Sequence, residues 1–340
     1  MNVTRRNLLR AGAGVGAASA LGFNILPQPA HAAEFNLKIG HGQTTEHPLD
    51  PRLKEAAEKI KAETGGRVEI QVSGNSALGS EAQMMAQVRS GALDMLCTSV
   101  LFLEGTLPAV SISGLAFAYK NNDEGWAAWD GEFGDYIRSG LEKQGILVFD
   151  KIFEHGFREM TTAVRPINEP GDLKGLKLRV PAWPILSSMC EQLGASPTTI
   201  GIKEVYSALQ THIADGQENP LASIEFFKFY EVQKYCSMTN HIWDPFCMFA
   251  SPKRLGVLPA NLREIVVNNI NSAALKQRLE MRHLNETLRG KIAQSGIIFN
   301  DPDQELFRKK LSELGFYKYW KEKYDPVAWR ILEKYCGTLG

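Results

Sequence analysis

The sequence has no excess of charge of either sign. Its 340 residues include 38 Lys and Arg against 38 Asp and Glu, so the formal net charge is zero. Proteins that bind nucleic acid through a strong basic field carry a surplus of Lys and Arg, so we expect no nucleic-acid partner. A content of 44% hydrophobic and 22% charged residues indicates an ordinary globular protein rather than a disordered polar chain.

Long apolar runs, a cysteine framework and catalytic motifs are also missing. After the N-terminal stretch, no segment approaches the roughly 18–20 apolar residues that span a membrane. Five scattered cysteines are too few for a disulfide framework, and their odd number leaves at least one free. There is no nucleophile elbow, phosphate-binding loop, H-E-x-x-H or paired C-x-x-C motif. We therefore expect a protein that is not an enzyme and uses no cofactor.

The first 32 residues have the pattern of a cleavable export signal. The pair Arg5-Arg6 precedes a modest apolar run over residues 11–26 and the small-residue triplet Ala30-His31-Ala32. Adjacent arginines at this place are typical of the twin-arginine type of signal. Cleavage after Ala32 removes three arginines and no acid, which leaves 308 residues with 35 basic and 38 acidic side chains and a net charge of −3. We predict a periplasmic protein.

Residues 12–17 match the G-x-G-x-x-A fingerprint of dinucleotide-binding proteins. That motif works where a strand delivers the glycines to the N-terminus of a helix. No strand pattern precedes these residues and signal cleavage would remove them, so no nucleotide site is predicted.

The rest of the chain alternates between strand and helix patterns. Strands are predicted near residues 35–39, 68–72, 93–96, 145–149, 175–180 and 297–299, and helices after Asp50-Pro51, after Ser80 and over 184–193. An aromatic stretch over residues 126–136 is expected at the surface. Long helices are predicted over residues 262–292, with little strand signal before Ile297. This order predicts α/β lobes with mainly parallel sheets and a helical C-terminal part.

Two groups of residues have types that can bind a metal ion. Cys236, His241 and Cys247 are three soft ligands, but structural zinc sites normally close with four ligands at tighter spacing. His41 and His47 share a loop with Glu46. Neither group has the ligand number or spacing of a known site, so no metal is predicted.

Arginines at the ends of strands are more informative. Arg179 ends an apolar strand and precedes Pro181, which is the place in an open α/β sheet where ligands usually bind. A guanidinium there can hold a carboxylate with two parallel hydrogen bonds, although a salt bridge within the protein is the alternative. Arg158 can supply a second cationic contact, and Asn219 is either a polar ligand contact or a turn residue.

The same residues lie in motifs that resemble a known family. The motifs are Leu78–Glu81, Gly91–Asp94, Gly156–Arg158, Arg179–Pro181, Leu193–Thr198, Glu204–Thr211, Asp215–Pro220, Phe229–Tyr235 and Thr239–His241. In this order they resemble the solute-binding proteins of TRAP transporters, the tripartite ATP-independent periplasmic carriers of the DctP type. The resemblance extends over nearly all of residues 35–320.

The resemblance implies a two-lobed periplasmic binding protein fold of the α/β class. Two lobes with mixed, mainly parallel sheets enclose a central cleft, and a long helix spans both lobes. Lobe I is expected to comprise residues 33–155 and about 244–283. Lobe II is expected to comprise residues 156–243 and about 284–340, including the C-terminal helices.

The resemblance also implies which residues bind the solute. The arginine at the position of Arg179 clamps the solute carboxylate, and the residues at Arg158 and Asn219 assist it. The other lobe contributes a polar residue near Glu81 and the loop after the first strand. The remaining candidates of this substrate-binding set are His41 and Gln43 in that loop and two aromatic walls, Trp183 and Trp243, with Phe246 as the alternative to Trp243.

The expected function is that of the periplasmic subunit of a TRAP transporter, which captures a small organic carboxylate by lobe closure. A sugar acid such as a uronate or an aldonate is favoured. A C4-dicarboxylate, a 2-oxo acid, an aromatic acid, a sensory role and a cofactor-dependent periplasmic enzyme stay open as alternatives. The expected partners are the organic acid and the small and large integral membrane proteins of the transporter, and the protein is expected to be a monomer.

Overall fold

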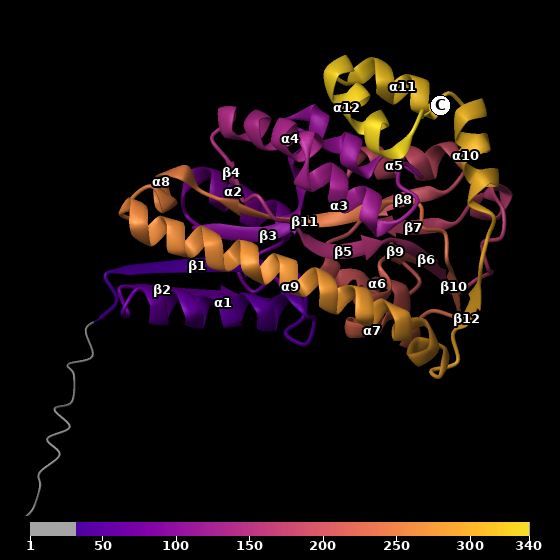
Figure 1. Ribbon diagram of the computed structural model, residues 1–340. Helices are drawn as coiled ribbons and strands as arrows, with labels where there is room; N and C mark the ends of the chain where they lie inside the picture. Colours follow the sequence, from indigo (N-terminus) through magenta and orange to yellow (C-terminus); the bar gives the residue numbers. More distant parts are fainter. Residues whose placement is uncertain (1–31, 340) are drawn as a thin grey trace, which may run out of the picture. The chain divides into compact units, whose positions relative to one another are not determined.

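The computed structural model describes residues 32–339. The G-x-G-x-x-A motif of residues 12–17 and, apart from Ala32, the predicted export signal lie outside the described residues. The described residues form two β-sheets flanked by helices (Figure 1). Within them, no helix is both long and apolar enough to cross a membrane.

The first sheet, sheet A, is built around β1. Its strands in spatial order are β2 (Val68–Ser73), β1 (Phe35–His41), β3 (Met95–Ser99), β11 (Trp243–Ala250) and β4 (Leu147–Val148), and β5 (Phe153–Phe157) also pairs with β11. The pairs of β1 with β2 and β3 are parallel. All pairs of β11 are antiparallel, because this strand enters from the other sheet.

The second sheet, sheet B, has six short strands. In spatial order they are β12 (Ile298–Asn300), β10 (Tyr235–Ser237), β6 (Glu159–Thr162), β9 (Gly216–Asn219), β7 (Lys177–Val180) and β8 (Ser196–Thr199). Strand β7 is parallel to both neighbours, while β6 is antiparallel to β9 and β10. We call the part of the chain around sheet A lobe I and the part around sheet B lobe II.

The chain passes between the sheets at three places. Strand β5 of sheet A is followed, after Arg158 alone, by β6 of sheet B, and residues 238–242 lead back from β10 to β11. The third connection is α9 (Ala260–Ala293), which runs past both sheets (Figure 1). Its first half packs in the core of sheet A and its second half in the core of sheet B. The two-lobed α/β fold with a spanning helix is therefore confirmed, whereas the division at residues 155/156 and 243/244 stays a prediction.

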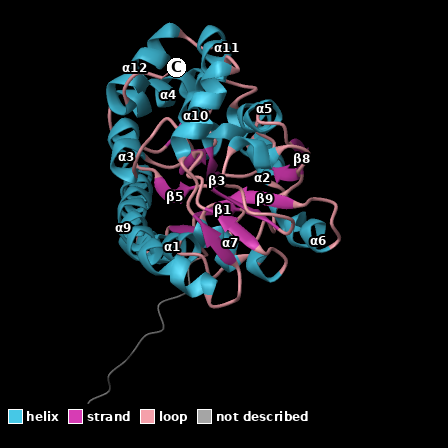
Figure 2. Ribbon diagram, turned by 90° about the vertical axis from the view of Figure 1, so that its right-hand side faces the viewer, coloured by secondary structure: helices cyan, strands magenta, loops and turns pink. Residues whose placement is uncertain are grey.

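Helices surround both sheets (Figure 2). They are α1 (Leu49–Glu63), α2 (Glu81–Ser90), α3 (Asn122–Asp130), α4 (Glu132–Lys143), α5 (Pro184–Gln192), α6 (Val205–Gln210), α7 (Leu221–Phe226), α8 (Pro252–Leu255), α10 (Gln304–Glu313), α11 (Phe316–Lys323) and α12 (Pro326–Cys336). Although the sequence groups the C-terminal helices with lobe II, α12 packs against α3 and α4, which lie between strands of lobe I.

Two expectations about local structure are wrong. The aromatic stretch over residues 126–136 forms α3 and α4, and Trp129 and Phe133 are completely buried in the core. Strand β11 has a fully buried run of eight residues that the sequence analysis does not predict. Pro245 obscures its pattern, and the structure accommodates this proline at a shift in register between Asp244 and Pro245.

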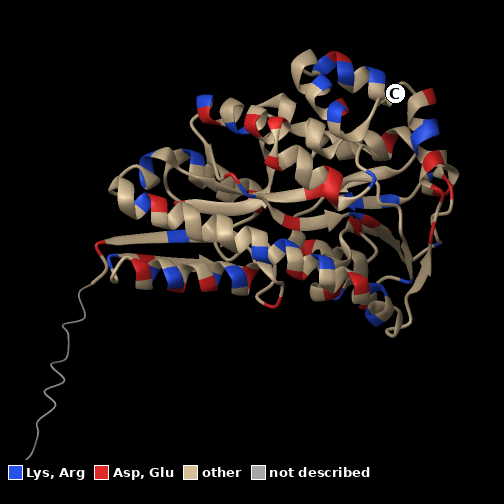
Figure 3. Ribbon diagram, in the orientation of Figure 1, with Lys and Arg blue, Asp and Glu red and all other residues tan. Residues whose placement is uncertain are grey.

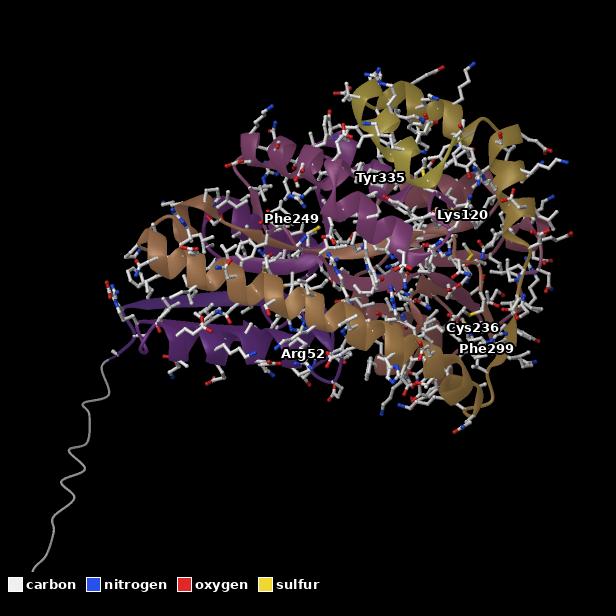
Figure 4. The ribbon with its side chains drawn as sticks, in the orientation of Figure 1. Arg52, Lys120, Cys236, Phe249, Phe299 and Tyr335 are labelled. Atoms are coloured by element: carbon white, nitrogen blue, oxygen red, sulfur yellow. The ribbon has the colours of Figure 1, made fainter. Side chains whose placement is uncertain are left out.

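Polar contacts between helices fix the position of α9 along lobe I. Arg52 of α1 lies against α9 (Figure 4), and its Nε donates to Glu280 Oε2 at 2.7 Å. Basic and acidic side chains alternate along α1, α9 and the C-terminal helices rather than gathering on one face (Figure 3). Because the Arg52–Glu280 pair is still partly accessible to solvent, it contributes at most about 1 kcal/mol.

Helix α2 is important for the site because its first residue is Glu81. The hydroxyl of Ser80 accepts a hydrogen bond from the Gln83 N–H, and the Gln83 side chain accepts one from the Ser80 N–H. This capping box satisfies two backbone donors that the helix itself cannot pair.

We expect Ser80→Ala to lower the free energy of unfolding by about 1 kcal/mol, because it leaves the Gln83 N–H without its partner. Urea unfolding followed by circular dichroism measures the loss. The matched control is Ser312→Ala, an exposed serine inside α10, which should change stability by less than about 0.5 kcal/mol. Equal losses in both variants would contradict the role of the cap.

Candidate functional site

A small cavity lies between the two sheets. Sheet A and the segments attached to it contribute Gln43, Glu81, Thr98, Phe102, His155, Asp244 and Phe246. The segment from Arg158 onward and sheet B contribute Arg158, Arg179, Pro181, Trp183, Ile202 and Asn219. The cavity has a volume of about 30 Å³, which is room for one or two water molecules.

Arg179 brings an unpaired positive charge to this cavity. It is the third residue of β7, opposite Thr198 and Gln217 of the neighbouring strands, and its side chain is 3% exposed. Its Nε donates to the carbonyl oxygen of Ile200 at 2.7 Å. The ion pairs formed by the described residues do not include Arg179. Burial, with the charge of Arg158 acting in the same direction, lowers the pKa of Arg179 to about 10.

The charge of Arg158, in contrast, is compensated inside the protein. Its Nε and Nη2 donate to the two carboxylate oxygens of Glu218, and Nη1 donates to Asp244 Oδ2 at 3.1 Å. Burial alone would lower the pKa of Arg158, but the two carboxylates raise it. Its Nη2 also donates to Asn219 Oδ1 at 3.2 Å. Arg158 therefore lines the cavity as the centre of a buried network rather than as a free cation.

Backbone geometry at the crossover places Arg158 in this network. Gly156 has a φ of 112°, which side-chain-bearing residues rarely adopt, and it lies opposite Asp244 at the register shift of β11. The bend directs the chain from sheet A to sheet B within two residues. The Arg158 N–H then donates to the carbonyl oxygen of Ile242 at 2.8 Å. This hydrogen bond joins the β5–β6 connection to the segment of residues 238–242, which leads back to sheet A.

A chain of hydrogen bonds connects Asp244 to the loop after β1. The His155 ring contacts Asp244 Oδ2 through Nδ1 at 3.1 Å and Ser223 Oγ through Nε2 at 3.0 Å. The hydroxyl of Ser223 donates to Gln43 Oε1 at 3.2 Å. Since Ser223 belongs to α7 beside sheet B and Gln43 follows β1 of sheet A, this chain ties the two lobes together across the cavity.

Aromatic side chains form the apolar part of the wall. Trp183 packs edge-on against Phe102, with ring centroids 5.6 Å apart, and the Arg158 guanidinium lies 4.7 Å from the Trp183 ring. On the other side Phe246 stacks on His155 at 4.0 Å. Flat apolar faces next to cationic and polar groups suit a ligand with a ring or a carbon chain and a carboxylate.

The lobes are in contact around the cavity. Besides the bond between Ser223 and Gln43, Lys203 Nζ donates to the carbonyl oxygen of Ser76 at 3.4 Å. The Ile185 N–H, at the start of α5, donates to Glu104 Oε2 at 3.4 Å. These contacts hold the two lobes together beside the cavity, so separating the lobes would enlarge it.

The structure brings together six of the eight residues predicted for the site. Gln43, Glu81, Arg158, Arg179, Trp183 and Asn219 all line the cavity. Asn219 ends β9, and its amide also donates to Gln217 Oε1 at 2.6 Å. Glu81 lies at the start of α2 and faces the cavity from the other lobe.

The other two predicted residues, His41 and Trp243, do not line the cavity. His41 is completely buried, and its Nε2 contacts Asp50 Oδ2 at 3.0 Å beneath the loop. Trp243 packs against Tyr119, with centroids 5.3 Å apart. Because side chains alternate along a strand, Asp244 and Phe246 face the cavity and Trp243 faces the opposite side, so the structure places Phe246, the alternative to Trp243, in the wall.

Sequence reasoning missed Asp244, which accepts a hydrogen bond from Arg158, and His155, which links Asp244 to Ser223. Asp244 is a polar residue in the otherwise apolar strand Trp243–Ala250, and that pattern was the available signal. His155 lies in the mixed strand Phe153–Phe157, which gives no such signal. His241, considered above as a zinc ligand, instead contacts Glu218 Oε2 at 3.2 Å through Nε2. All five cysteines are buried and free.

Comparisons with known proteins give a consistent result. Residues 39–322 match the family described as bacterial extracellular solute-binding protein, family 7 (DctP). The chain is 33% identical over 310 residues to the uncharacterized protein y4mM of Sinorhizobium fredii, covering 90% of this chain but only 56% of that protein's length. It is 30% identical to the sialic acid-binding periplasmic protein SiaP of Vibrio cholerae, covering 83% of this chain and 88% of SiaP.

A solved structure shows the same fold. The TRAP periplasmic solute-binding protein of Sulfitobacter sp. NAS-14.1, with bound β-D-galacturonate, superposes with a TM-score of 0.84. The match covers 89% of this chain and all of that one, at 25% sequence identity.

Proposed function

Because the chain belongs to family 7 of the bacterial extracellular solute-binding proteins, the DctP family, we propose that its cavity captures a small organic carboxylate for a TRAP transporter. The observation that carries the proposal is the buried guanidinium of Arg179, which has no ion pair among the described residues. A buried charge is costly unless a partner neutralises it. A solute carboxylate supplies that partner.

Capture follows from the arrangement around Arg179. The two terminal nitrogens of its guanidinium can donate two parallel hydrogen bonds to a carboxylate, which sets the orientation of the solute. Asn219 and Arg158 lie beside it, and Gln43 and Glu81 reach the solute from lobe I. Without a solute, the unpaired charge of Arg179 favours open lobes. With one, closure excludes water and strengthens every polar contact.

A sugar acid is the class of solute that this cavity suits best. Trp183 and Phe102 offer apolar faces to a ring or an extended carbon chain, and Gln43 and Thr98 offer neutral polar groups to hydroxyls. A relative with bound β-D-galacturonate has the same fold, so this fold can accommodate a sugar acid. The family consists of binding proteins, and no catalytic step is proposed.

The proposed cellular setting follows from the family and the sequence. Export through the twin-arginine route at Arg5-Arg6 would deliver the protein to the periplasm. There it would act as a monomer and pass its solute to the small and large membrane subunits of the transporter. The closed form is the one that these subunits should recognise.

A thermal-shift screen of organic acids against the mature protein tests the proposal. We expect at least one sugar acid to raise the melting temperature, because a solute at about 1,000 times its Kd adds about 4 kcal/mol to stability. Each positive acid is compared with its neutral parent sugar, which lacks the carboxylate. The proposal fails if neutral compounds stabilise the protein and no carboxylate does.

A further inference from the structure

The two sides of the cavity carry charges of opposite sign. The cations that line it, Arg158 and Arg179, belong to the crossover and to sheet B. The carboxylates that line it, Glu81 and Asp244, lie on the side of sheet A, where no Lys or Arg of the described residues lines the wall. One cation and one carboxylate of the lining, Arg158 and Asp244, contact each other at 3.1 Å, so Arg179 and Glu81 are the charged groups left to meet a solute.

On each wall of the cavity, only one of the two charged side chains lacks a direct ion pair. Asp244 accepts hydrogen bonds from Ser99 Oγ at 2.6 Å and from Arg158 Nη1 at 3.1 Å, and it also contacts His155. Arg158 is occupied by Glu218 as well. The ion pairs of the described residues include neither Arg179 nor Glu81. These two side chains face the same cavity without a direct ion pair, although each lies within electrostatic reach of the other.

Local packing holds the carboxylate of Glu81 at this place. A Cβ atom on Gly42 would lie 2.0 Å from Glu81 Oε1, so the carboxylate rests directly on the backbone of Gly42. Only a residue without a side chain allows this approach. Burial raises the pKa of Glu81, and the nearby guanidinium of Arg179 opposes that rise. The carboxylate is thus in a partly dehydrated position within electrostatic reach of the arginine.

We infer that Glu81 makes the cavity selective for monocarboxylates with hydroxyl groups at the far end, and excludes dicarboxylates. This rests on the proposed function, in which Arg179 binds the first carboxylate. The far end of the solute then meets Glu81. A hydroxyl there donates a charge-assisted hydrogen bond, whereas a second carboxylate faces a like charge with little water between them. Gln43 and Thr98 on the same wall are neutral, which suits hydroxyls rather than a cation.

Calorimetric titration with matched pairs of solutes tests the inference. Gluconate and glucarate, and galactonate and galactarate, differ only in a terminal CH2OH or carboxylate. We expect the wild-type protein to bind the better aldonate at least 100-fold more tightly than its aldarate, since opposed like charges cost several kcal/mol. Glu81→Gln should reduce that preference at least tenfold, mainly by binding the aldarate more tightly.

Two further variants test whether the preference depends on a carboxylate in the cavity wall and on the position of that carboxylate. Glu204→Gln removes an exposed carboxylate that also influences Arg179 but does not line the cavity, so it should keep the wild-type preference. Gly42→Ala keeps the charge of Glu81 but displaces its carboxylate, and it should weaken aldonate binding at least tenfold.

The outcomes distinguish the inference from the proposed function. If no carboxylate binds the wild-type protein, the proposed function fails and the inference fails with it. If succinate or an aldarate binds as tightly as the aldonates, or if Glu81→Gln keeps the full preference, the proposed function stands and the inference is overturned. If an amino acid such as serine binds more tightly than any aldonate, the inference that Glu81 accepts a hydrogen bond from a solute hydroxyl is overturned, because Glu81 then binds an ammonium group.

Discussion

Replacing Arg179 with methionine is expected to abolish binding of organic acids and to shift the solute-free protein toward its closed form. Removing one partner of a buried ionic contact costs about 2–5 kcal/mol, which corresponds to roughly a 30- to 4,000-fold increase in Kd. The buried guanidinium also opposes closure when no solute is bound. Burial lowers the pKa of Arg179 to about 10, which means that its charged form is disfavoured in the cavity, and methionine removes that charge while filling a similar space.

Titration calorimetry measures the loss of binding in Arg179→Met, and small-angle scattering measures its shift toward the closed form. The solute-free variant should have a smaller radius of gyration than the solute-free wild type. Arg179→Lys keeps a positive charge but loses the planar pair of donors, so it should bind at least tenfold more weakly and stay open. Arg289→Met removes an arginine from an exposed pair with Asp301 and should change neither property. Wild-type affinity in Arg179→Met would refute the arginine clamp.

The largest expected loss of stability comes from Glu218→Gln. Glu218 and Asp244 are the carboxylates that compensate Arg158 in a completely buried site. Breaking a buried pair by removing one partner typically costs about 3–5 kcal/mol, because the other charge stays buried. For a protein of this size we expect the melting temperature to fall by roughly 5–15 °C. The triple variant Arg158→Met, Glu218→Leu, Asp244→Asn removes all three charges of the network and should recover part of that stability.

The ion pair between Arg158 and Glu218 predicts that the stability of the protein depends on pH. Burial opposes ionisation of Glu218, but Arg158 and His241 overcome it and lower its pKa to about 2, against an ordinary value of 4.5. A carboxylate with a depressed pKa stabilises the fold above its ordinary pKa and loses that contribution as the pH falls toward 2. Acid unfolding of the wild type should therefore steepen below pH 4.5, and Glu218→Gln should lack this component.

Asp301→Asn serves as the control for these measurements. Its carboxylate forms an exposed pair with Arg289, so its loss should cost less than about 1 kcal/mol. If Glu218→Gln is no less stable than this control, the buried network does not support the crossover in the way described.

Several parts of the site were predictable because they follow from local sequence. An arginine at the end of an apolar strand identifies Arg179, and the family motif Asp215–Pro220 identifies Asn219. The capping pattern at Ser80 predicts where α2 starts, and thereby the place of Glu81. Each of these depends on residues within a few positions of one another.

Two of the predicted residues lie outside the cavity for a common physical reason. His41 was assigned to the site because it follows the first strand, but it is held by Asp50 of α1. Trp243 was assigned because it is aromatic and close to a motif, but the alternation of a strand obscured by Pro245 turns it away. In both cases contacts with other elements, and not the local pattern, determine the direction of the side chain.

The sequence alone determined the class of protein: the alternating strand and helix periods, the arginine at a strand end and the family motifs are all local properties of the chain. The tertiary structure decided which charges are free. Arg158 and Arg179 look alike in the sequence, yet Asp244, 86 positions away, and Glu218 neutralise the first and leave the second unpaired. Coulombic compensation depends on distance in space, and only folding brings residues so far apart in the chain within hydrogen-bonding reach.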